Sequence, residues 1–259
     1  MANDPAPFIQ ALRHSHHSLR ALVEPLTDGQ LEHRSYCPDW SIAQVLSHLG
    51  SQAEIFGLWL DAGLTGQDLP GQDTFRPIWD GWNTRVPRAQ AADSLEANEA
   101  LIQRFESLDA GQQERFHLEL FGMDLDTTGL ARMRLSEHAI HSWDVAAALD
   151  PAARVAPDAV GLIVDTLGPL AARSGKPAGT KLRLHVSASD PQRDFTLESG
   201  DTVTLAPSAP GEDPGLPDLQ LPAEALVRLV YGRLDPAHTP PVETRGVDLD
   251  ELRRLFPGF

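Results

Sequence analysis

The sequence predicts an α+β protein with a helical first half and a second half in which strands and helices mix. Up to about residue 150, apolar side chains recur every three or four residues, as in amphipathic helices. Beyond residue 180 they alternate, as in half-buried strands, for example at Leu182, Leu184 and Val186. Because the pattern changes after Asp150-Pro151, we expect two domains, residues 1–150 and 151–259.

Four long helices are expected in the first half, at about residues 6–26, 41–62, 89–108 and 129–149. The second has a well-defined start, because Ser41 and Gln44 suit a capping box and Trp40 with Val45 suits a hydrophobic staple. The stretch from Gly63 to Arg88, rich in Gly, Pro, Asp and Trp, is interpreted as a long crossover of the kind that covers an active site. A short extended piece is expected at residues 116–120.

The second half is expected to open with a helix at about 157–173. Four strands and two further helices then follow, at about residues 182–186, 195–197, 203–205, 218–221, 223–233 and 248–256. A hairpin turn is expected at 198–201, and a low-complexity loop at 206–217.

Composition limits the classes of protein that fit. The formal net charge of −16, from 37 acidic and 21 basic residues, argues against a nucleic-acid partner. No apolar run reaches membrane-spanning length, so no membrane partner is expected. Cys37 is the single cysteine, which excludes an intramolecular disulfide, and with no leader pattern we expect a cytoplasmic protein, a monomer or a dimer. Cys37 itself is interpreted as a small apolar filler.

A metal site is indicated by Glu137 and His141, which stand four residues apart in an expected helix. That spacing places both side chains on one face, where they can bind one divalent cation. His48, at the edge of the apolar stripe of the second helix, is the best candidate for a third ligand. Two imidazoles and one carboxylate leave a coordination position open, as in catalytic zinc sites, although nickel or iron would also suit these ligands.

Each of these residues also has an ordinary interpretation. His48 can be a half-buried histidine satisfied by a polar neighbour, and the Glu137 row can be a solvated helix face. A second histidine cluster, His14, His16 and His17, occurs in the first helix, but only His16 falls near its apolar stripe, so the other two are expected to be exposed.

Three motifs carry a resemblance to a known family. They are Pro38-Asp39-Trp40-Ser41 followed by Val45 and Ser47-His48-Leu49, then Glu137-x-x-x-His141-x-Trp143-Asp144, and finally Val230-Tyr231-Gly232-Arg233. The first half resembles the DinB-like metal-binding bundles, and the whole chain resembles the mycothiol-dependent maleylpyruvate isomerase family. The resemblance implies an up-down-down-up four-helix bundle with zinc on His48, Glu137 and His141, and a smaller C-terminal α+β domain similar to sterol-carrier-like folds.

The expected chemistry is activation of a low-molecular-weight thiol, because a metal-bound thiol loses its proton and the thiolate is the nucleophile. The thiol, mycothiol or a similar one, would add to or be transferred to a small electrophile, possibly a dicarboxylate. Arginine forks would bind such carboxylates. Arg85 and Arg233 are the expected catalytic arginines and Arg134 is expected to bind substrate or thiol, while Asp144 is expected to orient the imidazole of His141.

Two functions from other classes remain open at this stage. One is a metal-dependent hydrolase that uses metal-bound water, and the other is a non-catalytic protein that binds metal or a small ligand. A requirement for a thiol distinguishes the isomerase or S-transferase from the hydrolase. Absence of any turnover would favour the binding protein.

Overall fold

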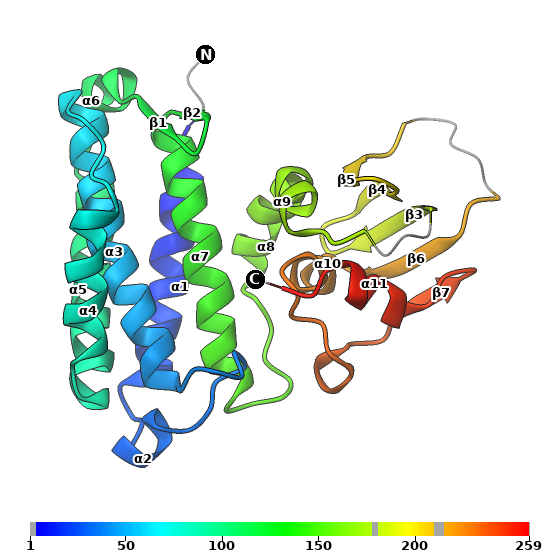
Figure 1. Cartoon of the computed structure of the whole chain (residues 1–259), viewed down its shortest axis with the longest axis horizontal. Coiled ribbons are helices and arrows are strands. Elements are labelled where there is room, and N and C mark those ends of the chain that lie inside the picture. Colours follow the sequence, from blue (N-terminus) through cyan, green and yellow to red (C-terminus); the bar gives the residue numbers. More distant parts are fainter. Residues whose placement is uncertain (1–3, 178–180, 210–214, 259) are drawn as a thin grey trace. The chain divides into compact units, whose positions relative to one another are not determined.

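The chain forms two compact units, Met1–Arg154 and Val155–Phe259, which are described separately (Figure 1). The computed structural model describes residues 4–177, 181–209 and 215–258. Within those residues no helix is both long enough and apolar enough to cross a membrane. The division falls shortly after Asp150-Pro151, where the apolar pattern of the sequence changes.

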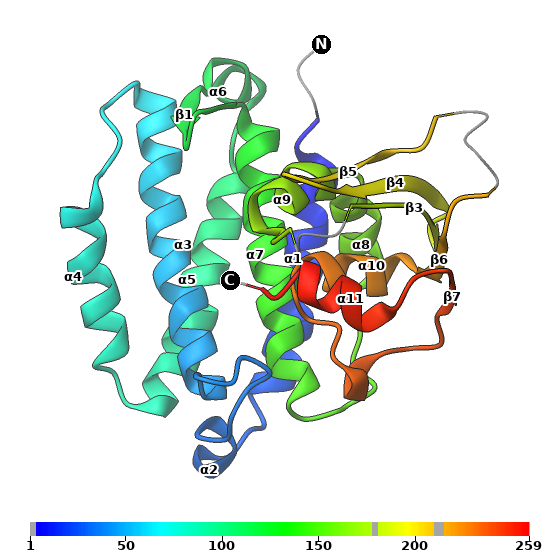
Figure 2. The ribbon, with the colours of Figure 1, turned by 45° about the vertical axis from the view of Figure 1, so that its right-hand side comes forward.

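The first unit is a four-helix bundle of α1 (Ala6–Val23), α3 (Ile42–Thr65), α5 (Pro87–Glu106) and α7 (Thr127–Ala147). Helices α1 and α3 each pack against both α5 and α7. Figures 1 and 2 show that α3 and α5 run in one direction and that α1 and α7 run in the other. The expected up-down-down-up bundle is therefore confirmed.

Helix α3 begins where the sequence indicates. The Ser41 side chain accepts a hydrogen bond from the Gln44 backbone N–H, and the Gln44 side chain accepts one from the Ser41 N–H at 2.8 Å. These two bonds satisfy amide donors that a helix start leaves open. Helix α3 buries side chains on most of its surface. Because its first residue is fixed by the capping box, the few side chains that stay accessible are fixed too.

Parallel α3 and α5 require a long connection, and this connection contains a helix that the sequence interpretation missed. Helix α4 (Gln72–Asn83) lies within the expected crossover from Gly63 to Arg88. Pro77 inside it lacks a backbone donor, which made the segment resemble a loop. The helix is stabilised by packing, since the Trp82 ring is buried against Gly50 of α3 and its Nε1–H donates to Glu54 at 2.9 Å.

Two short helices and a β-hairpin complete the first unit. Helices α2 (Asp28–Leu31) and α6 (Ala110–Arg115) both begin with capping boxes. The expected extended piece is the first strand of an antiparallel hairpin, β1 (Leu118–Leu120) and β2 (Met123–Leu125). Phe121 and Gly122 form its turn with φ values of 54° and 74°, the left-handed conformation that a two-residue type I′ turn requires.

The second unit is built on a sheet whose described strands have the order β5-β4-β3-β6-β7. The strands are β3 (Leu182–Ser189), β4 (Arg193–Ser199), β5 (Val203–Pro207), β6 (Asp218–Pro222) and β7 (Glu243–Arg245). Neighbouring strands are antiparallel except β3 and β6, which are parallel. The expected strands are present, but β7 was not expected, because its residues are all exposed and show no apolar alternation.

The helices of this unit are α8 (Pro157–Ile163), η1 (Val164–Thr166), α9 (Leu167–Ser174), α10 (Ala223–Val230), η2 (Pro236–His238) and α11 (Leu249–Leu255). Helix α9 packs against β5, and α10 packs against β6 and β3. Part of the expected loop at 206–217, residues 210–214, lies outside the described residues. The expected α+β architecture is confirmed.

Packing of Trp82 on a glycine gives a first prediction. A Cβ at Gly50 would lie 2.2 Å from the Trp82 ring, whereas one at Gly81 of α4 meets nothing within 4 Å. We expect Gly50→Ala to lower the free energy of unfolding by about 1–3 kcal/mol, because a buried ring must move. Gly81→Ala, the control, should be neutral or stabilising by up to about 1 kcal/mol. Urea unfolding measures both, and equal effects would contradict the packing described.

A second prediction follows from His16, which is buried as expected, whereas His14 and His17 are exposed. Burial lowers the pKa of His16 to about 4, with Arg20 acting in the same direction and Glu99, 3.4 Å away, opposing it. In the unfolded chain the imidazole takes up its proton near pH 6.5. The unfolded state therefore binds more protons between these values, and stability falls as pH drops through this window.

The loss expected from His16 is about 3 kcal/mol between about pH 6.5 and 4. His16→Leu should remove this part of the pH dependence, while His17→Leu, at the exposed neighbour, should retain it. Unfolding free energies measured across the window check both variants. Parallel pH curves for wild type and His16→Leu would show that burial of this imidazole does not control acid sensitivity.

Candidate metal centre

Helices α3 and α7 bring His48, Glu137 and His141 together. His48 Nε2 lies 3.6 Å from Glu137 Oε2, and His141 Nε2 lies 3.7 Å from the same oxygen. The two imidazole rings meet edge to face with their centroids 4.6 Å apart. All three ligand atoms fall within 4.8 Å of one another. Two segments far apart in the sequence thus place two nitrogens and one carboxylate oxygen around a common point.

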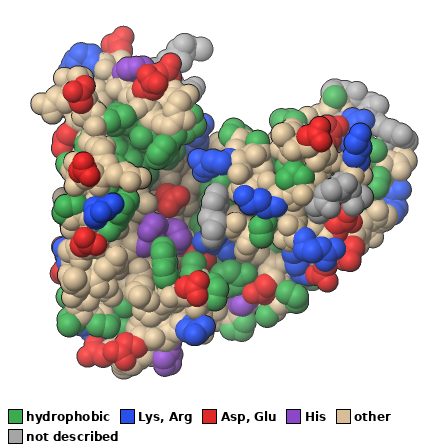
Figure 3. Space-filling model, in the orientation of Figure 1, with side chains coloured by type: hydrophobic (Ala, Val, Ile, Leu, Met, Phe, Trp, Pro, Cys, Tyr) green, Lys and Arg blue, Asp and Glu red, His purple; other side chains and the backbone are tan. Residues whose placement is uncertain are grey.

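Local structure explains how each helix presents its ligands. Glu137 and His141 are one turn apart on α7, so both project from the same face. His48 lies at the edge of the buried stripe of α3, half-buried between Ser47 and Leu49, which are fully buried. Figure 3 shows histidine side chains at several places on the surface of the helical unit.

The residues present fit a divalent cation. Ligand bonds of about 2.0–2.1 Å at tetrahedral angles separate two ligand atoms by about 3.3 Å, close to the separations from Glu137 to the two imidazoles. His48 Nε2 is buried and has no hydrogen-bond partner among the described residues. An unpaired buried nitrogen is costly unless something binds it. A metal ion on this atom removes that cost.

The Asp144 carboxylate contacts the imidazole of His141. His141 Nδ1 lies 2.8 Å from Asp144 Oδ2, and Asp144 is fully buried. When Nδ1–H donates to this carboxylate, Nε2 carries the lone pair and is available as a ligand. The Cys37 thiol donates to the same oxygen at 3.2 Å. Cys37 is thus more than the apolar filler that the sequence suggested.

Potential ligand atoms of Cys37, His141 and Asp144 also lie within 4.8 Å of one another. Their mutual hydrogen bonds account for this proximity without an ion. His141 Nδ1 belongs to this group and His141 Nε2 to the group with His48 and Glu137, so one imidazole connects the two. The arrangement matches that of histidines which bind a metal while a carboxylate holds the other ring nitrogen.

The protonation states of the ligands suit metal binding. Burial raises the pKa of Glu137, but the nearby imidazoles of His48 and His141 and the guanidinium of Arg134 outweigh it and bring the pKa to about 2. Burial is the main cause that lowers the pKa of His48. At neutral pH the carboxylate is therefore ionised and the His48 imidazole is neutral, which are the forms that coordinate metals.

Trp40 forms an aromatic wall beside the two histidines. Its ring centroid lies 5.1 Å from that of His48 and 6.3 Å from that of His141. The loop that carries Trp40 is attached to α7, because the Tyr36 N–H donates to the Asp144 carbonyl at 3.0 Å and the Tyr36 ring packs on Trp143. Trp40 also packs against the apolar core of the bundle. Its helix-start motif gave no indication that the ring lies beside the two histidines.

The three predicted arginines lie in different environments. Arg134 is fully buried, with burial as the main cause that lowers its pKa to about 10, so it remains charged at neutral pH. Arg85 is half-buried, pairs with Asp93 at 3.1 Å and stacks 3.7 Å above the Trp82 ring. Arg233 belongs to the second unit, where it donates to the Tyr231 carbonyl at 2.6 Å. Because Arg134 is fully buried, a substrate or thiol at the surface of the first unit cannot contact it.

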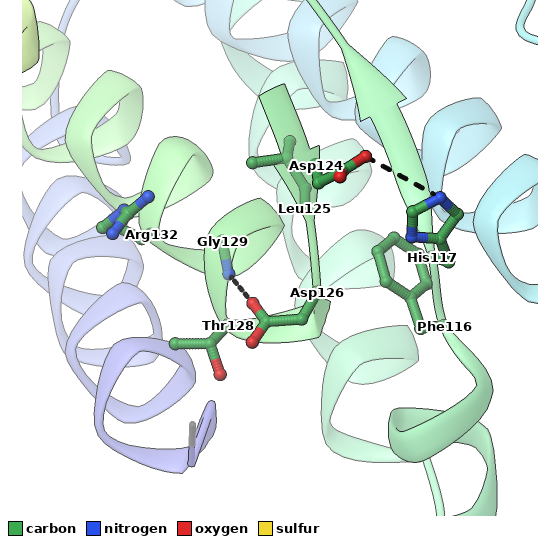
Figure 4. Close-up of a pocket in the computed structure, with 8 residues that line it drawn as sticks. All are labelled: Phe116, His117, Asp124, Leu125, Asp126, Thr128, Gly129 and Arg132. Carbon is green, nitrogen blue, oxygen red and sulfur yellow. Dashed lines mark hydrogen bonds and ion pairs between the residues drawn. The ribbon is translucent and has the colours of Figure 1, made fainter. Parts of the chain in front are cut away.

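A pocket at the end of the bundle lies apart from the three ligands. It has a volume of about 380 Å³ and is lined by the hairpin and the start of α7 (Figure 4). Asp126 in its wall caps α7 by accepting from the Gly129 N–H at 2.7 Å. Asp124 and His117 form a long, exposed ion pair of 3.9 Å. Of these side chains, Asp126 has a structural role as the N-cap of α7.

The fold and the site define a class: a helical bundle with an open set of two histidines and one glutamate, followed by an α+β unit. The profile of the mycothiol maleylpyruvate isomerase N-terminal domain matches residues 12–146, more than half of the chain. The chain therefore belongs to this family.

Solved structures support the same fold over nearly the whole chain. The crystal structure of the mycothiol-dependent maleylpyruvate isomerase has a TM-score of 0.65 and 14% sequence identity. That of its histidine-to-alanine mutant has a TM-score of 0.66 and 14% identity. In both comparisons 89% of this chain and 90% of the other chain are covered. No curated protein matches the sequence.

The contact between Asp144 and His141 gives a third prediction. Asp144→Asn keeps the size of the side chain but removes the charge that holds Nδ1–H. We expect metal affinity to fall about 10–100-fold, as is usual when the carboxylate partner of a ligand histidine is lost. Calorimetric zinc titration measures the change. Asp93→Asn, an exposed carboxylate of the same unit, is the control, and equal affinities for all three proteins would contradict the role of Asp144.

Proposed function

We propose that the protein is a metal-dependent enzyme that activates a low-molecular-weight thiol, mycothiol or a similar one, for addition or transfer to a small electrophile. The convergence of His48, Glu137 and His141 carries this proposal. Membership of the mycothiol maleylpyruvate isomerase N-terminal domain family supports a thiol-dependent isomerisation as the reaction.

His48, Glu137 and His141 are the proposed ligands of a divalent cation, zinc being the best match and nickel or iron being compatible with the same ligands. The bound cation supplies Lewis acidity, which lowers the pKa of a coordinated thiol so that the thiolate persists at neutral pH. Three protein ligands leave a position for that sulfur. Glu137 contributes one negative charge, so that the centre retains positive charge for an anionic ligand.

The surrounding residues have separate tasks in this proposal. Asp144 holds His141 in the tautomer that binds through Nε2. Trp40 shields one side of the histidine pair from water. Arg85 and Arg233 remain the proposed groups for substrate carboxylates. Binding there requires Arg85 to share its guanidinium with Asp93, its ion-pair partner.

Reversible addition of a thiol to a conjugated double bond gives net cis-to-trans isomerisation and regenerates the thiol. Transfer to an electrophile uses the same activation but consumes the thiol. Arginines suit a carboxylate-bearing acceptor in either case, because their two parallel N–H donors match a carboxylate. A small unsaturated dicarboxylate is therefore the proposed substrate class.

The fourth prediction tests this function directly. Wild-type protein should bind about one equivalent of divalent metal, and turnover of an unsaturated dicarboxylate should require both metal and thiol. His48→Ala should lose most of its metal and at least about 100-fold in turnover, because two ligands hold an ion far less tightly than three. His33→Ala, which changes an exposed histidine of the same unit, is the matched control.

Metal analysis, followed by a thiol-dependence assay, distinguishes the alternatives. Turnover that needs metal but no thiol would replace the proposal with a hydrolase. Metal binding without turnover of any electrophile would leave a binding protein. Full metal retention by His48→Ala would remove this histidine from the site and contradict the proposed ligand set.

A further inference from the structure

A buried arginine links the two helices that carry the proposed metal ligands. Arg134 stands one turn before Glu137 on α7, and its side chain is fully inaccessible to solvent. Its Nη2 donates to the carbonyl oxygen of Leu49 on α3 at 3.0 Å and to Asn98 Oδ1 on α5. One guanidinium nitrogen therefore joins three helices of the bundle.

The shared acceptor lies beside a proposed metal ligand. Leu49 directly follows His48, and its carbonyl also receives the Asn98 side-chain N–H at 3.4 Å. Asn98 is anchored on its own helix by a 2.8 Å bond from Nδ2 to the Ser94 carbonyl. Donors from α5 and α7 thus meet at a single oxygen of α3, one residue from His48.

Burial of the Arg134 guanidinium in this arrangement lowers the free energy of unfolding. Nε and Nη1 of Arg134 are buried without a hydrogen-bond partner among the described residues. The charge of Glu137 and the Phe56 ring, 5.4 Å from the guanidinium carbon, compensate the buried cation only in part. Burying a cation without a close counter-charge costs several kcal/mol, and an apolar side chain of similar size commonly fills such a space at lower cost. Stability alone gives no reason for an arginine here.

The position of Arg134 between the two ligand-bearing helices gives a reason for an arginine here. His48 comes from α3, whereas Glu137 and His141 come from α7, so the ligand separations depend on how these two helices are rotated and shifted against each other. A shift by one residue moves a side chain by about 1.5 Å along the helix and turns it by about 100°. The bond from Arg134 to the Leu49 carbonyl resists such a shift beside the ligands.

We propose that Arg134 is a positioning residue which, with Asn98, holds α3 against α7 so that His48 reaches the ion shared with Glu137 and His141. This inference rests on the proposed metal site. It replaces the expectation that Arg134 contacts substrate or thiol, which its complete burial disfavours.

The fifth prediction compares arginines that bind α3 at different places. Arg134→Met removes the donors at similar volume, and Arg134→Lys keeps a charge and a single donor group. Arg104→Met is the matched control, because Arg104 of α5 donates to the Gly57 carbonyl of α3 at 3.3 Å, more than two turns from His48. Zinc affinity is measured by competition with a chromophoric chelator, and unfolding of the metal-free protein is measured alongside.

We expect Arg134→Met to weaken zinc binding at least about 10-fold, a loss of the size seen when groups supporting metal ligands are removed. Arg134→Lys should lose less, and Arg104→Met should stay within two-fold of wild type. The visible spectrum of the cobalt-substituted protein should change in Arg134→Met, since it reports ligand geometry. A purely structural role would lower the unfolding midpoint but leave zinc affinity and the cobalt spectrum unchanged.

Several outcomes would overturn the inference. A folded Arg134→Met protein with zinc affinity within two-fold of wild type would do so. If that variant does not fold, Asn98→Leu is measured in the same way, and unchanged zinc affinity there has the same meaning. If wild type itself binds no zinc, nickel or iron, the proposed metal site fails, and this inference fails with it.

Discussion

The packing of α3 against α7 is the constraint on which the proposed chemistry depends. Neither helix could hold a cation alone, because α7 carries two of the proposed ligands and α3 carries one. Packing in the bundle holds His48 Nε2 and Glu137 Oε2 3.6 Å apart. The long connection that contains α4 allows α3 and α5 to run parallel in this bundle. The site is therefore a product of helix packing rather than of a loop.

Around this contact the structure places costly groups that a stable bundle does not need. The buried Asp144 carboxylate, the unpaired His48 nitrogen and the buried Arg134 cation, two of whose nitrogens have no hydrogen-bond partner, all lie on α3 or α7. Buried polar groups of this kind lower stability unless a ligand or a network satisfies them. Their occurrence on these two helices is what the proposed metal site would account for, and it shows that the polar residues of α7 do not form a simple solvated face.

Much of the fold follows from local pattern. The helix starts, the alternation of the strands and the spacing from Glu137 to His141 are all properties of neighbouring residues, so they were predictable. Helix α4 was missed because Pro77 and its exposed polar residues resemble a loop, and its stability comes from Trp82 packing on Gly50. Strand β7 was missed because the pairing with β6, not its own composition, makes it a strand.

The sequence by itself determined the helical and α+β halves, the three ligand residue types and, through its motifs, the resemblance to the isomerase family. Only the tertiary structure decided that Arg134 is buried on the Leu49 carbonyl, that Cys37 donates to Asp144 and that Trp40 lies against both histidines. The physical reason is that periodicity reports which face of an element is apolar. It carries no information about which residue of another helix that face will meet.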